Sequence, residues 1–258
     1  MYRDSDFHKS VMSIKGEKPW VGKIKPFKII NQVYYVGTYQ ACCYLIDTGD
    51  GLIMIDPGYN NTTYLVLNNI YELGFKPTDI KYIIATHWHG DHAEAVEAFI
   101  DLSGAKTLIG KEDAINAEKY FKADILVSDG DKLSLGNITI EFLETPGHTK
   151  GTLSFFFDVT ENNKTYRVGQ FGGAGANTLV KEKYDFEGCV EAYKNSLSRL
   201  KEQKVDVFIG NHCWNNGTYE KASLIGKTEQ NPFIDSEIWN KFLSFCENRV
   251  NDIIAQGK

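Results

Sequence analysis

The stretch THWHGDH, residues 86–92, places three histidines and one aspartate within seven positions. The whole chain of 258 residues holds only six histidines. Gly90 relaxes the backbone in the middle of the stretch, as a tight loop requires. Imidazole and carboxylate groups packed this closely are costly to bury without a shared partner, and zinc accepts both as ligands. The stretch therefore predicts a metal site that contains His87, His89, Asp91 and His92.

Two further histidines are candidates for the remaining ligands. His148 lies in TPGHTKGT (145–152) and His212 in IGNHCW (209–214), and each follows an apolar segment that reads as a strand. Only His8 is left over, and we interpret it as an incidental surface residue.

Composition and charge exclude several classes of protein. Hydrophobic residues make up 42% of the chain and charged residues 24%, which is ordinary globular composition. The net charge is −6 and no dense Lys/Arg cluster occurs, so we expect no nucleic-acid partner. No apolar run approaches the roughly 20 residues that cross a bilayer. The first residues lack the apolar core of a secretory signal, so we expect a cytoplasmic protein, or an exported one if a leader has been removed.

The five cysteines do not form a zinc ribbon or a disulfide framework, because no CxxC pair occurs. Cys42 and Cys43 are adjacent, and the other three are scattered. A bridge between Cys213 and Cys246 remains an alternative to free thiols.

The order of segments predicts an α/β protein. Residues 1–26 read as a polar N-terminal arm, and 27–258 as a single domain without repeats or linkers. Within that domain, strands, a helix, a strand and a helix follow one another, and the second half repeats that order. The last segment, from about 235 to 256, has helical spacing that predicts an amphipathic helix lying on the core.

The chain resembles the metallo-β-lactamase superfamily through HxHxDH at 87–92, PGHT at 146–149 and the late His212. The resemblance covers about residues 27–215 and includes LIMIDPG at 52–58. It implies a four-layer αβ/βα sandwich, in which two mixed β-sheets pack face to face with helices on the outer faces. It also implies two metal sites and a buttress, Asp56, that orients the ligand loop. The implied ligands are His87, His89 and His148 for the first metal, and Asp91, His92 and His212 for the second.

One departure from the family pattern indicates a subgroup. Many members carry a bridging aspartate after the strand that follows PGHT, whereas this chain reads VGQFGGAGAN (168–177) there. Residues 172–174 offer no donor, and no cysteine replaces it. This pattern resembles the third subgroup of metallo-β-lactamases, whose second metal takes Asp, His and His. A Gly-rich phosphate cradle is the alternative for 171–177, but no Lys-Ser/Thr follows. The small residues more simply let the backbone approach the metals.

The resemblance implies a dinuclear zinc hydrolase. Two zinc ions would hold a hydroxide that attacks a carbonyl, and Asp91 would orient it and return its proton to the leaving group. Zinc is favoured over iron, because related di-iron proteins carry an acidic residue in place of His89. Side chains beside the ligands could contact a small-molecule substrate, namely Trp88, Lys150, Asn177, Trp214 and Asn215. No oligomeric state is predicted.

Three functional hypotheses follow. The first is opening of a cyclic amide, a β-lactam above all. The second is hydrolysis of lactones or thioesters at the same site, against which the missing bridging aspartate counts. The third is a non-catalytic, metal-binding member, against which the intact set of six ligands counts.

Overall fold

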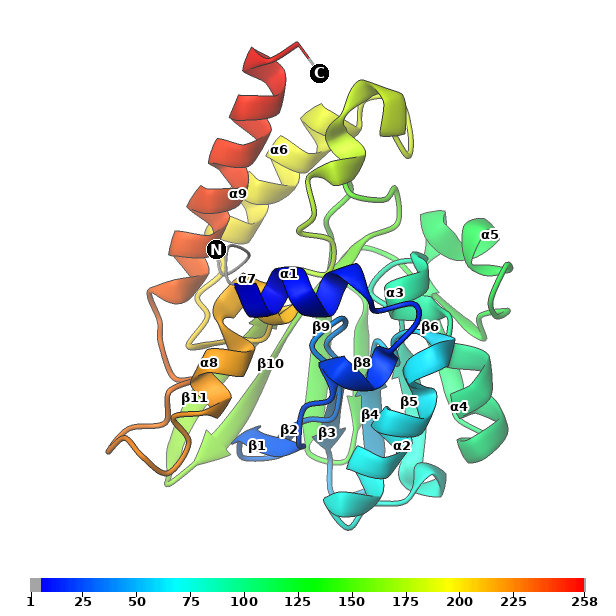
Figure 1. The fold of residues 1–258 in the computed structure, drawn as a ribbon, viewed down its shortest axis with the longest axis vertical. Helices are drawn as coiled ribbons and strands as arrows, with labels where there is room; N and C mark the ends of the chain where they lie inside the picture. Colours follow the sequence, from blue (N-terminus) through cyan, green and yellow to red (C-terminus); the bar gives the residue numbers. More distant parts are fainter. Residues whose placement is uncertain (1–5, 258) are drawn as a thin grey trace.

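The computed structural model describes residues 6–257, and their strands form two mixed β-sheets (Figure 1). The first sheet has seven strands in the order β1 to β7, antiparallel from β1 to β4 and parallel from β4 to β7. Its strands are β1 (Phe27–Ile30), β2 (Val33–Tyr35), β3 (Tyr44–Asp47), β4 (Leu52–Ile55), β5 (Ile80–Ile84), β6 (Lys106–Gly110) and β7 (Ile125–Val127).

The second sheet has five strands in the order β12-β11-β10-β9-β8. Only β11 and β12 pair in parallel, and the other neighbours are antiparallel. Its strands are β8 (Lys132–Leu135), β9 (Ile138–Glu144), β10 (Leu153–Glu161), β11 (Lys164–Gln170) and β12 (Val207–Phe208).

Alternating side chains bury both faces of each sheet. In β4, Ile53 and Ile55 belong to the core between the sheets, whereas Leu52 and Met54 belong to the core on the outer face. In β10, Phe155 and Phe157 point into the same central core, and Phe156 points outward. Because side chains alternate along a strand, continuous apolar runs such as these predict strands that are covered on both sides.

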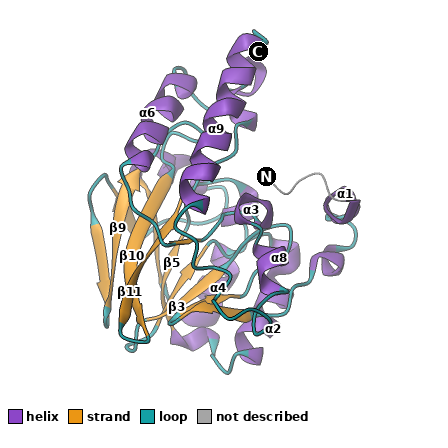
Figure 2. Cartoon of the chain, turned by 90° about the vertical axis from the view of Figure 1, so that its left-hand side faces the viewer, coloured by secondary structure: helices purple, strands orange, loops and turns teal. Residues whose placement is uncertain are grey.

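Helices cover the outer faces (Figure 2). α2 and α4 pack on the seven-stranded sheet through residues such as Val66 and Phe99, while α6 and α9 pack on the five-stranded sheet through residues such as Leu197 and Phe242. This arrangement confirms the predicted four-layer αβ/βα sandwich. The α-helices are α1 (Asp6–Ser13), α2 (Thr63–Glu72), α3 (Gly90–Ala93), α4 (Val96–Ser103), α5 (Ala114–Ala117), α6 (Cys189–Lys201), α7 (Cys213–Asn216), α8 (Thr218–Ala222) and α9 (Ile238–Ala255).

The predicted N-terminal arm is partly helical over the residues that the structure describes. It contains α1 and a 3-10 turn at Pro19–Gly22, while residues 1–5 lie outside the described part. The interpretation of His8 as an incidental surface residue is wrong. Its ring is partly buried and packs edge-on against Trp214, with 4.7 Å between ring centroids.

The structure does not support a bridge between Cys213 and Cys246, because all five cysteines are free and buried. The Sγ atom of Cys213 lies 3.8 Å from that of Cys42, in the core between the sheets. Cys246 lies in the separate core beneath α9. Within residues 6–257, no helix has both the length and the apolar character needed to span a membrane.

The topology brings several loops to one edge of the sandwich. β4, β5 and β6 are parallel, so the segments that follow them emerge side by side at their carboxyl ends. In the other sheet, β9, β11 and β12 run in the same direction, and their following loops likewise emerge together. Sequence-distant segments therefore meet at this edge.

Candidate metal centre

The loop after β5 carries four of the predicted ligands. β5 ends at Ile84, the chain turns through Thr86, and the four-residue helix α3 begins directly after His89. The ring of His87 lies 4.9 Å from that of His89 and 4.2 Å from that of His92, between centroids. The short loop therefore gathers three imidazoles around one point.

The other sheet supplies the two remaining histidines. His148 follows β9, and its Nε2 lies 3.0 Å from Nδ1 of His89. His212 follows β12, and its Nε2 lies 3.6 Å from Oδ2 of Asp91. The same carboxylate oxygen lies 3.5 Å from Nε2 of His92. The structure thus brings all six sequence-predicted ligand residues together, although His148 and His212 are far from the others in the sequence.

Two groups of donor atoms are spaced closely enough to share a cation. They are His87, His89 and His148 in one group, and His87, Asp91 and His92 in the other, with donor atoms within 4.8 Å of one another in each group. Among residues 6–257, Nε2 of His87 is buried and finds no hydrogen-bond partner. Buried polar atoms are normally satisfied. A bound metal cation would satisfy this nitrogen, so the residues present fit a metal.

Asp56 contacts the ligand loop from the end of β4. Its Oδ1 accepts a hydrogen bond from the backbone N–H of Thr86, and its Oδ2 accepts one from the Thr86 hydroxyl, both at 2.8 Å. Oδ2 also lies 2.8 Å from Nδ1 of His92. Asp56 adopts a left-handed backbone conformation with φ +49°, which is costly for a residue other than glycine. The strained backbone thus occurs at the residue that orients His92.

A second buried carboxylate, Asp113, contacts the ligand loops and was not predicted from the sequence. It follows β6, and its oxygens accept hydrogen bonds from the Thr149 hydroxyl and from the backbone N–H groups of Gly151 and Trp88. Burial raises the pKa of Asp113 to about 6. Its position in the sequence could have indicated this role, because Asp113 follows a short apolar strand as Asp56 follows β4.

Burial keeps three of the histidines neutral. It lowers the pKa of His87 well below the ordinary range, and nearby His92 lowers it further. It also lowers the pKa of His148 to about 3, with a smaller contribution from His89, and it lowers the pKa of His89. Metal ligation requires the neutral imidazole. These three side chains are therefore already in the protonation state that binds a cation.

His92 behaves differently from the other three histidines. Burial lowers its pKa, but the neighbouring carboxylates of Asp91 and Asp56 outweigh that effect and raise it to about 10. Burial in turn raises the pKa of Asp91, but the positive charge of His92 holds it well below its usual range. Without a metal, the buried cluster therefore holds an ion pair between Asp91 and His92.

The glycine-rich loop 171–177 lies against the centre. The carbonyl oxygen of Gly175 lies 2.7 Å from Nδ1 of His148. A Cβ atom on Gly172 would come within 1.9 Å of the Leu153 carbonyl oxygen, and one on Gly173 within 2.9 Å of the His148 Cβ. Small residues therefore let this backbone approach the histidine.

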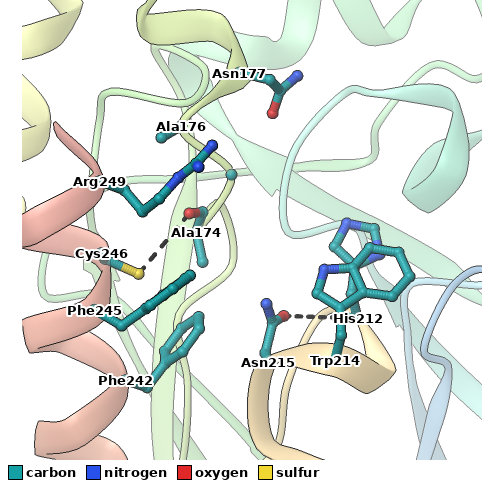
Figure 3. A pocket seen from close by; sticks show the side chains of 11 residues that line it. Ala174, Ala176, Asn177, His212, Trp214, Asn215, Phe242, Phe245, Cys246 and Arg249 are labelled. Atoms are coloured by element: carbon teal, nitrogen blue, oxygen red, sulfur yellow. Dashed lines mark hydrogen bonds between the residues drawn. The ribbon is translucent and has the colours of Figure 1, made fainter. Parts of the chain in front are cut away.

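A cavity of about 240 Å³ opens beside His212 (Figure 3). Three of the predicted substrate-contacting residues line it: Asn177, Trp214 and Asn215. The Trp214 ring stacks on the His212 ring, with 4.4 Å between centroids and 8° between planes. Asn215 Oδ1 accepts a hydrogen bond from the His212 backbone N–H at 2.9 Å. Trp214 and Asn215 thus also support His212.

The other two predicted substrate contacts, Trp88 and Lys150, do not line this cavity, although the Trp88 ring packs edge-on against the His89 ring at 4.6 Å. Trp88 packs against the core outside the seven-stranded sheet, and its Nε1 donates to Asp185 at 3.3 Å. The Lys150 ammonium pairs with Glu112 at 2.5 Å, on the surface. Each lies next to a ligand in the sequence, but a neighbouring carboxylate holds its side chain.

Comparisons with known proteins agree with this geometry. The structure is similar to BJP-1, a subclass B3 metallo-beta-lactamase of Bradyrhizobium japonicum, with a TM-score of 0.86 and 28% identity over 94% of this chain and 97% of that one. It is also similar to the metallo-beta-lactamase GOB-18 from Elizabethkingia meningoseptica, with a TM-score of 0.81 and 28% identity over 93% and 95% of the two chains.

Among curated proteins, an N-acyl homoserine lactonase from a Bacillus species is 27% identical over 200 residues, which are 65% of this chain and 79% of the relative. The family model of the metallo-beta-lactamase superfamily matches residues 36–212, more than half of the chain and a span that includes all six predicted ligands. The chain therefore belongs to the metallo-beta-lactamase superfamily.

Proposed function

We propose that this protein is a zinc-dependent hydrolase that opens the cyclic amide of a β-lactam. The observation that carries the proposal is the convergence of five histidines and Asp91 at one edge of the sandwich, beside an open cavity. Two structural neighbours that are metallo-beta-lactamases, one of them of subclass B3, match more than nine tenths of the chain and support the substrate class.

Two zinc ions fit the donor set. His87, His89 and His148 would hold the first, and Asp91, His92 and His212 would hold the second. The donors are imidazoles and one carboxylate without a thiolate, which is typical of catalytic rather than structural zinc. Zinc is preferred to iron, because the carboxylate that commonly bridges two irons has no counterpart in the loop after β11.

When bound, the two zinc ions would supply a nucleophile near neutral pH and would polarise the scissile carbonyl. Asp91 would be the catalytic side chain. Its carboxylate oxygen lies 3.5 Å from Nε2 of His92 and 3.6 Å from Nε2 of His212. From this position it would orient the nucleophile and return its proton to the leaving nitrogen.

The backbone after β11 favours the amide over other substrates. Family members that act on thioesters and lactones commonly carry a bridging aspartate there. At Gly172 a Cβ would collide with the Leu153 carbonyl oxygen, so this position excludes a side chain without rearrangement. The second metal would therefore take only Asp91, His92 and His212.

The first test is zinc content and carbapenem hydrolysis by the full chain, with a chelator control. We expect about two zinc ions per chain and chelator-sensitive loss of ultraviolet absorbance. H148A and D91A should abolish turnover and keep the fold, while D50A, in an exposed turn, should match the wild type. A chain without zinc under zinc-replete conditions, or unchanged turnover in H148A or D91A, would refute the site.

A second candidate function is lactone hydrolysis, which the similarity to N-acyl homoserine lactonases favours. The same zinc-loaded preparation assayed with acyl lactones and thioesters separates the two. Turnover of lactones or thioesters but not of carbapenems would replace the first proposal. A zinc-loaded protein that hydrolyses none of these substrates would favour a non-catalytic, metal-binding role.

A further inference from the structure

One stripe of α9 forms a wall of the cavity beside His212. Phe242, Phe245 and Arg249 occupy positions i, i+3 and i+7, which share one helix face. Phe242 is buried against Phe208, whereas the Phe245 side chain remains 38% exposed and stacks on Phe242 with 6.4 Å between centroids. The stripe therefore leaves the core and continues as an exposed aromatic surface.

Arg249 places a positive charge at the end of this aromatic surface. In Figure 3 its side chain extends from α9 into the cavity, toward the loop that carries Ala176 and Asn177, with His212 on the opposite side. Within the described residues, no hydrogen bond or ion pair involves the guanidinium, and the cavity lining contains no acidic residue. The chain as a whole has a net charge of −6, so a cation that faces a cavity and pairs with no acid among residues 6–257 is a distinctive feature.

We propose that Arg249 is the specificity-determining residue of this site, and that its preferred substrates carry a carboxylate at the end of an apolar arm. The arm would lie along Phe242 and Phe245, and the carboxylate would meet the guanidinium. This inference rests on the proposed hydrolase function, because the scissile bond must lie at the metal centre on the His212 side of the cavity.

Physical chemistry favours this pairing of groups. Covering the exposed ring of Phe245 removes apolar surface from water, and an aromatic or aliphatic arm does so best. Guanidinium binds carboxylate through two parallel hydrogen bonds, a geometry that a neutral amide does not match. A ligand with both features would use the apolar wall and the charge together.

Turnover of matched substrates tests the proposal. Two β-lactams with the same nucleus would carry a phenyl-ended acyl arm, one with a para-carboxylate and one with the corresponding amide. We expect the acid to be preferred, and R249Q to raise its KM by about 10- to 100-fold with little change in kcat, the size of effect of a charged hydrogen bond. The amide substrate should be unaffected. R249K, which keeps the charge, should keep part of the preference.

The matched control is K241Q, which removes one positive charge from α9 outside the cavity, where Lys241 pairs with Glu237. It should behave as the wild type. Equal kcat/KM for the acid and the amide, or the same loss in R249Q and K241Q, would overturn the role of Arg249.

A binding experiment separates this inference from the proposed function. Calorimetry on the zinc-loaded full chain would compare 4-phenylbutyrate with 4-phenylbutanamide in the wild type, R249Q and K241Q. Zinc can bind the carboxylate equally in all three, so weaker binding of the acid in R249Q alone reports on Arg249. This result would support the anion site even if no β-lactam is hydrolysed, whereas equal affinities in all three proteins would refute it.

Discussion

The Thr149 hydroxyl donates a 2.6 Å hydrogen bond to Oδ2 of Asp113, joining the loop after β9 to the loop after β6. The same oxygen accepts the backbone N–H of Trp88 at 3.2 Å, and Oδ1 accepts that of Gly151 at 2.6 Å. Trp88 lies between two histidines of the ligand loop, and Thr149 directly follows His148. One buried carboxylate therefore ties together the two loops that carry the first predicted metal site.

Removing the Asp113 carboxylate should weaken zinc binding. We expect D113A to lower zinc affinity by about 10- to 100-fold, as outer partners of metal ligands commonly do, and to lower kcat. D113N should fall between D113A and the wild type. The measurement is a zinc titration against a competing chelator dye, together with steady-state kinetics.

The matched control is D124N, because Asp124 similarly accepts hydrogen bonds from the backbone and hydroxyl of Thr107. It lies directly before β7, and among residues 6–257 its hydrogen bonds join it to Thr107 of β6 rather than to a ligand loop. If D113A binds zinc as tightly as D124N does, Asp113 does not position the ligands.

The raised pKa of Asp113 should also make the free energy of unfolding depend on pH. Burial raises the pKa of Asp113 from 3.8 to about 6. Between pH 3.8 and 6, the carboxyl group is therefore protonated in the folded state and deprotonated in the unfolded state. Its contribution to stability is therefore present at low pH and is lost as pH rises through 6. One pKa unit corresponds to about 1.4 kcal/mol, so the whole change is at most about 3 kcal/mol.

Urea unfolding of metal-free wild type and D113N measures this contribution. The stability advantage of the wild type should shrink by about 2 kcal/mol between pH 4.5 and 7.5. The histidines titrate equally in both proteins, so they cancel in the difference. A difference that is constant or grows with pH would show that Asp113 is ionised in the fold throughout this range.

Zinc binding should release a proton. The neighbouring carboxylates raise the pKa of His92 to about 10 in the metal-free protein, so this imidazole is charged at pH 7.5 and must lose a proton to become a ligand. We expect the wild type to release about one proton per chain more than H92Q does, measured by calorimetry in buffers of different ionisation enthalpy. Equal proton release by the two proteins would contradict the prediction.

The close approach of the loop after β11 predicts a steric effect at Gly172. A Cβ atom there would lie 1.9 Å from the Leu153 carbonyl oxygen and 2.8 Å from the Thr86 Cβ. G172A should therefore destabilise the fold by about 1–3 kcal/mol, the usual cost of overpacking. At Gly16 an added Cβ meets nothing within 4 Å, so G16A should be close to neutral in thermal unfolding. Equal stability of the two variants would show that the loop can move aside.

Some features of the site were predictable because they are local. His87, His89, Asp91 and His92 lie within six positions, and their spacing on one short loop forces them together in any compact fold. The placement of Asp113 was not predictable. Its segment, Lys111–Asp113, looks like an ordinary polar turn, and its partners Thr149 and Gly151 lie far along the chain.

In the C-terminal helix, too, one feature was predictable from the sequence and another was not. Its apolar spacing correctly predicts a helix that packs on the core, and α9 buries Phe242 as expected. Phe245 and Arg249 follow Phe242 at the same helical spacing, and the sequence does not distinguish their surroundings from those of Phe242. In the structure both side chains line the cavity, while Val250 and Ile253, farther along the same helix, are buried in the core.

The α/β class, the strands buried on both faces and the histidine loop follow from the amino-acid sequence, because each depends on spacing between near neighbours. The packing of the two sheets brings His148 and His212 to that loop, lets Asp113 link two ligand loops and turns Arg249 toward a cavity. These relationships depend on which strand ends share an edge, and that is set by the packing of two sheets rather than by any local pattern.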